Sequence, residues 1–115
     1  MVDEIFKSEA KVRPEYREIF KLAGKLVEAG IPFEFNVFFG GAQIVYFEEA
    51  PDRSWTCSVI EHDGSYGHEI DQLEIMGLTT KEEDEIDSVA GPLSAEEVFR
   101  RISEDWKERS ANNGR

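Results

Sequence analysis

The sequence predicts an α+β fold: a three-stranded antiparallel meander packed against an N-terminal and a C-terminal amphipathic helix, with two short acidic helices between. Two apolar stripes with helical spacing, one toward each end of the chain, flank a central block in which apolar residues alternate. A sheet with one apolar face and helices with one apolar stripe bury those surfaces against one another. The length favours a single domain over residues 1–115, with a frayed tail at 110–115.

The first predicted helix begins at Pro14 and ends at Gly30. Proline is favoured in the first turn of a helix, where its missing N–H is not needed. Gly30 supplies the left-handed position that closes a helix, and Pro32 prevents continuation. We interpret residues 1–13 as an N-terminal arm. The apolar stripe of this helix comprises Tyr16, Ile19, Phe20, Ala23, Leu26 and Val27.

The three predicted strands lie in the stretch PFEFNVFFGGAQIVYF and at Ser54–Ile60. Apolar side chains alternate along Phe33–Phe39, the pattern of a strand with one buried face. Gly40–Gly41 is predicted to occupy the positive-φ positions of a tight hairpin turn, so that Ala42–Phe47 returns beside the first strand. Both sides of this hairpin carry apolar groups, which leaves a homodimer through an exposed patch as one alternative.

Two short helices and a long one are predicted after the strands. Residues 69–76 have apolar side chains at helical spacing and precede a glycine. Thr80 and Glu83 fit a capping box that starts a second short, acidic helix. Ser94 and Glu97 fit another capping box, ahead of the apolar stripe of the final amphipathic helix.

The net charge of −12 is concentrated in one part of the chain. Between Glu61 and Asp87, ten acidic residues stand against Lys81 alone, whereas residues 1–30 are balanced. Such a field repels phosphate backbones, so direct nucleic-acid binding is not expected. It favours a basic protein partner, although negative charge also serves solubility alone. The candidate acidic partner surface comprises Glu82, Glu83, Asp84, Glu85 and Asp87.

The run CSVIEHDGSYGHEIDQLEIMG, Cys57–Gly77, holds the only cysteine and both histidines. A structural zinc site takes four ligands, more than one Cys and two His supply. Residues an odd number apart on a strand face opposite ways, so Cys57 is predicted to join the core, and His62 to face away if the strand runs that far. A Mg²⁺ or Mn²⁺ site built from nearby carboxylates is the alternative. In so acidic a chain carboxylates cluster without purpose, and we predict no catalytic residue, metal site or cofactor.

The turn between the two histidines is the candidate contact site. It presents His62, Asp63, Ser65, Tyr66 and His68 at the end of a strand, a placement that often carries function. Two interpretations stay open. Either the loop contacts a partner or a ligand, such as a small molecule or nucleotide, or its side chains serve only its own packing.

The phrases GIPFEFNVFFGGAQIVYF, CSVIEHDGSYGHEIDQLEIMGL and DSVAGPLSAEEVFRRI resemble small proteins encoded in phages and prophages of Gram-positive bacteria. The resemblance covers most of Gly30–Ile102 and brings no activity with it. It implies an accessory protein in the bacterial cytoplasm. The single cysteine, the short apolar runs and an N-terminus without a signal-like apolar region fit that localisation, with no membrane contact. The main hypothesis is a non-enzymatic acidic module that binds a protein partner, with a basic host-encoded protein as one option.

Overall fold

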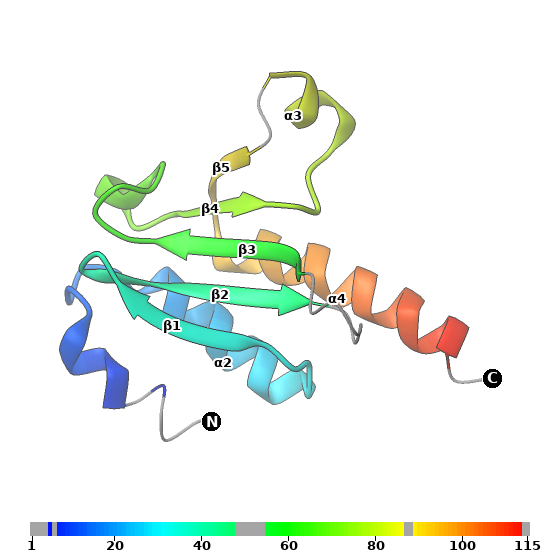
Figure 1. The fold of residues 1–115 in the computed structure, drawn as a ribbon, viewed down its shortest axis with the longest axis horizontal. Helices are drawn as coiled ribbons and strands as arrows, with labels where there is room; N and C mark the ends of the chain where they lie inside the picture. The colour runs from blue at the N-terminus through cyan, green and yellow to red at the C-terminus, as the bar shows by residue number, and fades with distance from the viewer. Residues whose placement is uncertain (1–4, 6, 48–54, 87–88, 114–115) are drawn as a thin grey trace.

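The computed structural model describes residues 5, 7–47, 55–86 and 89–113 and confirms the α+β class (Figure 1). Its strands form one antiparallel sheet in the order β1-β2-β3-β4-β5, so that neighbours in sequence are neighbours in space. The strands are β1 (Glu34–Phe38), β2 (Gly41–Phe47), β3 (Trp55–Glu61), β4 (Leu73–Met76) and β5 (Val89–Leu93). The helical segments are η1 (Glu9–Lys11), α2 (Glu18–Ala29), η2 (His68–Ile70), α3 (Lys81–Ile86) and α4 (Ala95–Asn113).

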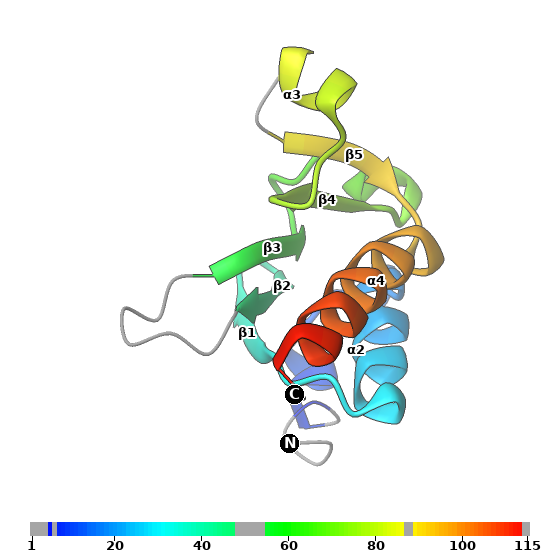
Figure 2. The same cartoon turned by 90° about the vertical axis from the view of Figure 1, so that its right-hand side faces the viewer.

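The molecule has two layers, because α2 and α4 lie on the same face of the sheet (Figure 2). The core between the layers follows the period-two pattern of the strands and the apolar stripes of the helices. Its fully buried apolar side chains include Ile19, Leu22, Leu26, Ile44, Tyr46, Cys57, Val59, Leu73, Ile75, Val98 and Ile102. The opposite face of the sheet carries the exposed side chains of β1 and β4.

The predicted three-stranded meander is correct in order and too short by two strands. The predicted helix over 69–76 is wrong, since only the short turn η2 precedes β4 there. Leu73 and Ile75 are buried while Met76 is exposed, which is strand alternation. In so short a segment the apolar residues also match helical spacing, and the sequence pattern could not separate the two. β5 was not predicted, because Gly91 and Pro92 resemble a loop; proline is accepted in an edge strand.

The β1–β2 hairpin turns one position earlier than predicted. Phe39 (φ 57°) and Gly40 (φ 74°) occupy the left-handed positions, and Gly41 already belongs to β2 opposite Phe38. Position 41 requires glycine because of a close backbone approach and not because of the turn. A Cβ at this position would collide with the Glu61 carbonyl oxygen and lie 2.6 Å from the Cα of His62. Phe39, predicted on the buried face, is instead 70% exposed.

The predicted capping box at Thr80 is confirmed in both directions, and that at Ser94 is confirmed in its N-cap half only. The Thr80 N–H donates to Glu83 Oε1 at 2.7 Å, and the Glu83 N–H donates to Thr80 Oγ1 at 3.2 Å. At the start of α4, the Glu97 N–H donates to Ser94 Oγ at 3.1 Å. These caps place α3 and α4 where the local sequence predicts them.

The N-terminus of α2 is capped by carboxylates from distant segments. The helix begins at Glu18 rather than at Pro14, and its preceding residue makes no side-chain cap. Asp71 Oδ1 accepts the N–H groups of Arg17 (2.8 Å) and Glu18 (3.0 Å). The carboxyl of Glu61, at the end of β3, accepts the Ile19 N–H at 3.1 Å. Side chains from the sheet and the following loop thus satisfy the free donors of this helix.

Glu18 extends the same arrangement to the second helix. Its Oε2 accepts the Ala95 N–H at 2.6 Å, at the first residue of α4, and its Oε1 lies 2.9 Å from Lys21 Nζ. Glu18 is buried, so this contact forms inside the interface between α2 and α4. The two helices are therefore fixed at their N-terminal ends to each other and to the sheet.

Candidate functional site

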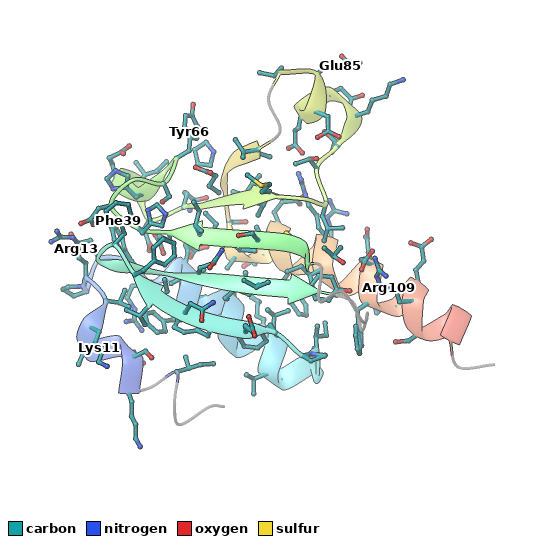
Figure 3. All side chains as sticks on the ribbon, in the orientation of Figure 1. Lys11, Arg13, Phe39, Tyr66, Glu85 and Arg109 are labelled. Atoms are coloured by element: carbon teal, nitrogen blue, oxygen red, sulfur yellow. The ribbon has the colours of Figure 1, made fainter. Side chains whose placement is uncertain are left out.

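Three segments that are far apart in sequence meet at one end of the sheet. Figure 3 shows Arg13, Phe39 and Tyr66 at this end, which we call the loop end: residues 13–16, 38–41 and 62–70. Backbone hydrogen bonds hold the segments together. The Asp63 N–H donates to the Phe39 carbonyl at 3.0 Å, and the Arg13 N–H donates to the Gly40 carbonyl at 2.9 Å.

A side-chain network centred on Asp63 joins the arm to the loop. Arg13 binds the Asp63 carboxylate through both Nε (2.6 Å) and Nη2 (2.8 Å). The Tyr16 hydroxyl donates to Asp63 Oδ1 at 2.7 Å and lies 3.2 Å from His68 Nδ1. His68 Nε2 in turn lies 2.7 Å from Glu69 Oε1.

The charges of this network suit positioning better than proton transfer. Hydrogen bonds from Arg13 and Tyr16 lower the pKa of Asp63 to about 2. Burial, followed by the Asp63 hydrogen bond, raises the pKa of Tyr16 to about 12. At neutral pH the carboxylate is therefore ionised and the phenol is protonated. Neither group is poised near the operating pH, as a general acid or base is.

We expect Asp63→Asn to lower the melting temperature at pH 7 and to have little effect near pH 2. The lowered pKa of Asp63 means that its carboxylate contributes stability above the ordinary value of 3.8, and that this contribution is lost as the pH falls through about 2. Melting curves followed by circular dichroism at both pH values measure the difference. An equal loss at both would show that the Asp63 charge plays no part.

His62 and Ser65 serve the internal structure of the loop. His62 is buried beneath the hairpin tip, with its ring centroid 4.9 Å from that of Phe38 and 5.5 Å from that of Phe39. Burial lowers the pKa of His62, and its Nδ1 accepts the Gly64 N–H at 3.0 Å. The Ser65 hydroxyl donates to the His62 carbonyl and accepts the His62 N–H, each at 3.0 Å. For these two residues the structure favours the packing interpretation.

Three aromatic side chains at the loop end face solvent instead. Phe38 is 41% exposed, Phe39 70% and Tyr66 63%. We call these three residues the aromatic surface. Tyr66 was a predicted site residue, whereas the alternating pattern of β1 wrongly placed Phe39 in the core. The signal that marks it is the pair of phenylalanines directly before the hairpin glycines.

The acidic candidate residues are only partly brought together. α3 projects away from the loop end, with Glu85 at its outer side (Figure 3). Glu82 and Glu85 are exposed. Glu83, however, binds Arg101 at 2.9 and 3.1 Å, while the Asp84 carboxylate accepts the Thr79 hydroxyl. Asp87, also predicted for this surface, lies outside the described residues. Glu83 therefore anchors α3 to α4 rather than presenting its charge to a partner.

A buried carboxyl pair lies behind the loop end. Glu61 is fully buried, and burial together with a hydrogen bond to Asp71 raises its pKa to about 9. For Asp71, burial acts to raise the pKa, but the hydrogen bonds from Glu61 and from the N–H groups of Glu18 and Arg17 lower it overall. The two neighbouring carboxyls thus shift in opposite directions, and Glu61 is the member of the pair that keeps its proton to higher pH.

Cys57 is separate from the histidines, as predicted. Its side chain is fully buried beside Val59, its thiol donates to the Gly77 carbonyl at 3.5 Å, and burial raises its pKa to about 12. A thiol in this protonated state is a poor nucleophile. Across the described ranges, no group of three or more His, Cys, Asp or Glu side chains is arranged to hold a metal ion.

Comparison with known proteins adds no relative. No protein-family model, curated protein or solved structure matches this chain. Within the described part, none of the helices combines the length and apolar character that crossing a membrane requires. The functional argument therefore rests on the loop end itself, where the network centred on Asp63 positions the aromatic surface.

Proposed function

We propose that this protein binds a protein partner through the aromatic surface. The observation that carries the proposal is Phe39, whose ring is 70% exposed although its backbone is left-handed at φ 57°. A bulky residue in this conformation costs about 1–2 kcal/mol, and glycine avoids that cost. Strained positions with exposed side chains point to function. Exposed aromatic rings on a fixed backbone are the side chains that dominate binding energy at protein interfaces.

A basic partner is the form of this proposal that the charge supports. The chain carries −12, and three of the carboxylates between Glu61 and Asp87 lie within the loop end and the adjacent strand: Asp63, Glu69 and Glu74. Two copies of so acidic a chain repel one another, which argues against a homodimer. The internal hydrogen bonds of His62 and Ser65 argue against a small ligand held by those groups. A role as a phage or prophage accessory protein in the cytoplasm is supported by the sequence resemblance alone.

Selection from a random peptide display library tests the proposal with Phe39→Gly as the variant. Glycine relieves the left-handed strain. We therefore expect the free energy of unfolding of the variant to equal that of the parent or to exceed it by up to about 1 kcal/mol. Peptides selected on the parent protein should be rich in basic and aromatic residues and should bind Phe39→Gly at least tenfold more weakly, a loss of about 1.4 kcal/mol.

Ile86→Ala is the matched control for this selection. Ile86 is 89% exposed and lies on α3, away from the aromatic surface (Figure 1). Its loss removes an exposed apolar side chain without touching the loop end, so peptide binding should persist. Peptides that bind Phe39→Gly as tightly as the parent would contradict the proposal, and so would a selection without enrichment.

A further inference from the structure

A hollow adjoins the aromatic surface on the β4–β5 side of the loop. It measures ≈ 670 Å³ and is lined by residues 63–70 together with Glu74, Val89 and Pro92. Tyr66 belongs to both the hollow and the aromatic surface. We infer that this hollow receives an arginine side chain of the partner, with its guanidinium on Glu74 and its stem on the apolar wall. The inference rests on the proposed function and specifies how the partner is recognised.

The charge of the lining selects a cation. Three carboxylates, those of Asp63, Glu69 and Glu74, line the hollow, and none of the lining residues is Lys or Arg. Arg13 already neutralises Asp63 from outside the hollow, through two hydrogen bonds. Glu69 is exposed and contacts His68. Of the three, Glu74 is the carboxylate for which, within the described residues, no ion pair with Lys, Arg or His is present, so its charge is the one that remains for a partner.

Glu74 is held in place for such a contact. Its Oε1 accepts the Tyr66 N–H at 2.7 Å, which fixes the carboxylate beside the backbone of the residue that carries the exposed ring. The Glu74 charge also acts on His62, where it opposes the burial that lowers the pKa of that histidine. A carboxylate that is positioned by a backbone N–H and half-buried on β4 is pre-organised to bind a charged donor.

The apolar wall distinguishes arginine from a bare cation. Tyr66 and Ile70 are each 63% exposed, and Pro92 also lines the hollow. Arginine places its methylene stem along apolar surface while its planar guanidinium stacks on an aromatic ring and donates to a carboxylate. The ammonium group of lysine is compact and more strongly hydrated, and it cannot stack on an aromatic ring as a planar guanidinium does. The combination of Tyr66 with Glu74 therefore favours arginine.

A titration of the full ¹⁵N-labelled chain with N-acetyl-arginine amide, followed by NMR, tests the inference. We expect the amide signals of Tyr66, Gly67 and Ile70 to shift at millimolar probe, and N-acetyl-glutamine amide to leave them unchanged. Glu74→Gln keeps an acceptor for the Tyr66 N–H and loses the charge, so binding should weaken at least about tenfold. Glu108→Gln, an exposed substitution on α4, is the matched control and should bind like the parent.

Three results would overturn the inference: unchanged amide signals, unchanged binding by Glu74→Gln, or a lysine probe that binds as tightly as the arginine probe. The amide spectrum of Glu74→Gln shows directly whether the variant is folded. The outcome is separable from that of the peptide selection. Selected peptides whose binding depends on Phe39 but not on Glu74 would support the aromatic surface as the binding site and contradict the inference that the hollow receives an arginine. Binding of the arginine probe, together with a selection that yields no peptides dependent on Phe39, would contradict the proposed function instead.

Discussion

Gly41→Ala is expected to destabilise the protein by at least about 3 kcal/mol, a large share of the typical 5–15 kcal/mol of a domain. The added Cβ would collide with the Glu61 carbonyl oxygen and lie 2.6 Å from the His62 Cα. Both are backbone atoms of the neighbouring segment, so no side-chain rotation relieves the contact. The pairing of β2 with β3 would have to separate at the point where the loop end is built. Urea unfolding followed by tryptophan fluorescence measures the loss.

Gly24→Ala is the matched control for that experiment. Gly24 lies within α2, is exposed, and has no atom within 4 Å of an added Cβ. Alanine is favoured over glycine inside a helix by about 1 kcal/mol, so this variant should be more stable than the parent. The same chemical change thus has opposite effects at the two positions. Equal effects would show that the close approach at Gly41 does not exist in solution.

Glu61→Gln is expected to remove a pH dependence of stability between about pH 5 and pH 9. The pKa of Glu61 is raised from 4.5 to about 9 in the folded protein. Between those values the folded state holds a proton that the unfolded chain has released. The free energy of unfolding therefore falls as the pH rises, by up to about 1.4 kcal/mol per pH unit, and the Glu61 contribution is complete only below the unfolded pKa.

Glutamine cannot titrate and still offers an oxygen to the Ile19 N–H and a donor toward Asp71. The variant should match the parent near pH 5 and exceed its stability increasingly toward pH 9. Urea unfolding at pH 5, 7 and 9 measures the two slopes, with Glu108→Gln as an exposed control that keeps the slope of the parent. Identical slopes in the parent and Glu61→Gln would mean that Glu61 is ionised in the folded state.

The elements that the sequence predicts well are those determined by neighbouring residues. The capping boxes at Thr80 and Ser94 place two helices because a cap depends on residues three positions apart. The alternating pattern likewise predicts the first three strands. β4 was not predicted because the apolar residues of a segment as short as Leu73–Met76 fit both the helical and the strand periodicity. β5 was not predicted because Pro92 is acceptable only at a sheet edge, which is a property of the assembled sheet.

The loop end shows the same division between local and long-range information. The glycine-punctuated turn marks His62–His68 as a loop, and Tyr66 proves exposed there. The hydrogen bond between Tyr16 and Asp63 joins residues 47 positions apart, so no local sequence pattern predicts it. Phe39 was misplaced because turn preferences assign left-handed positions to glycine. The close approach of the Glu61 carbonyl explains why position 41 is glycine although the left-handed positions of the turn are Phe39 and Gly40.

The carboxylate caps of α2 and α4 have a consequence for how the chain folds. Helix beginnings usually form with their own local caps. The start of α2 is instead capped by Asp71 across 53 positions, and α4 adds to its local Ser94 cap a contact with Glu18 across 77. Closing such long loops costs entropy before any cap is gained, so these helix starts are completed late. In the folded protein the same long-range contacts of Glu18 also affect local opening. Fraying of either helix start therefore breaks a contact with a distant segment, which couples the two starts to each other and to the loop that follows β3.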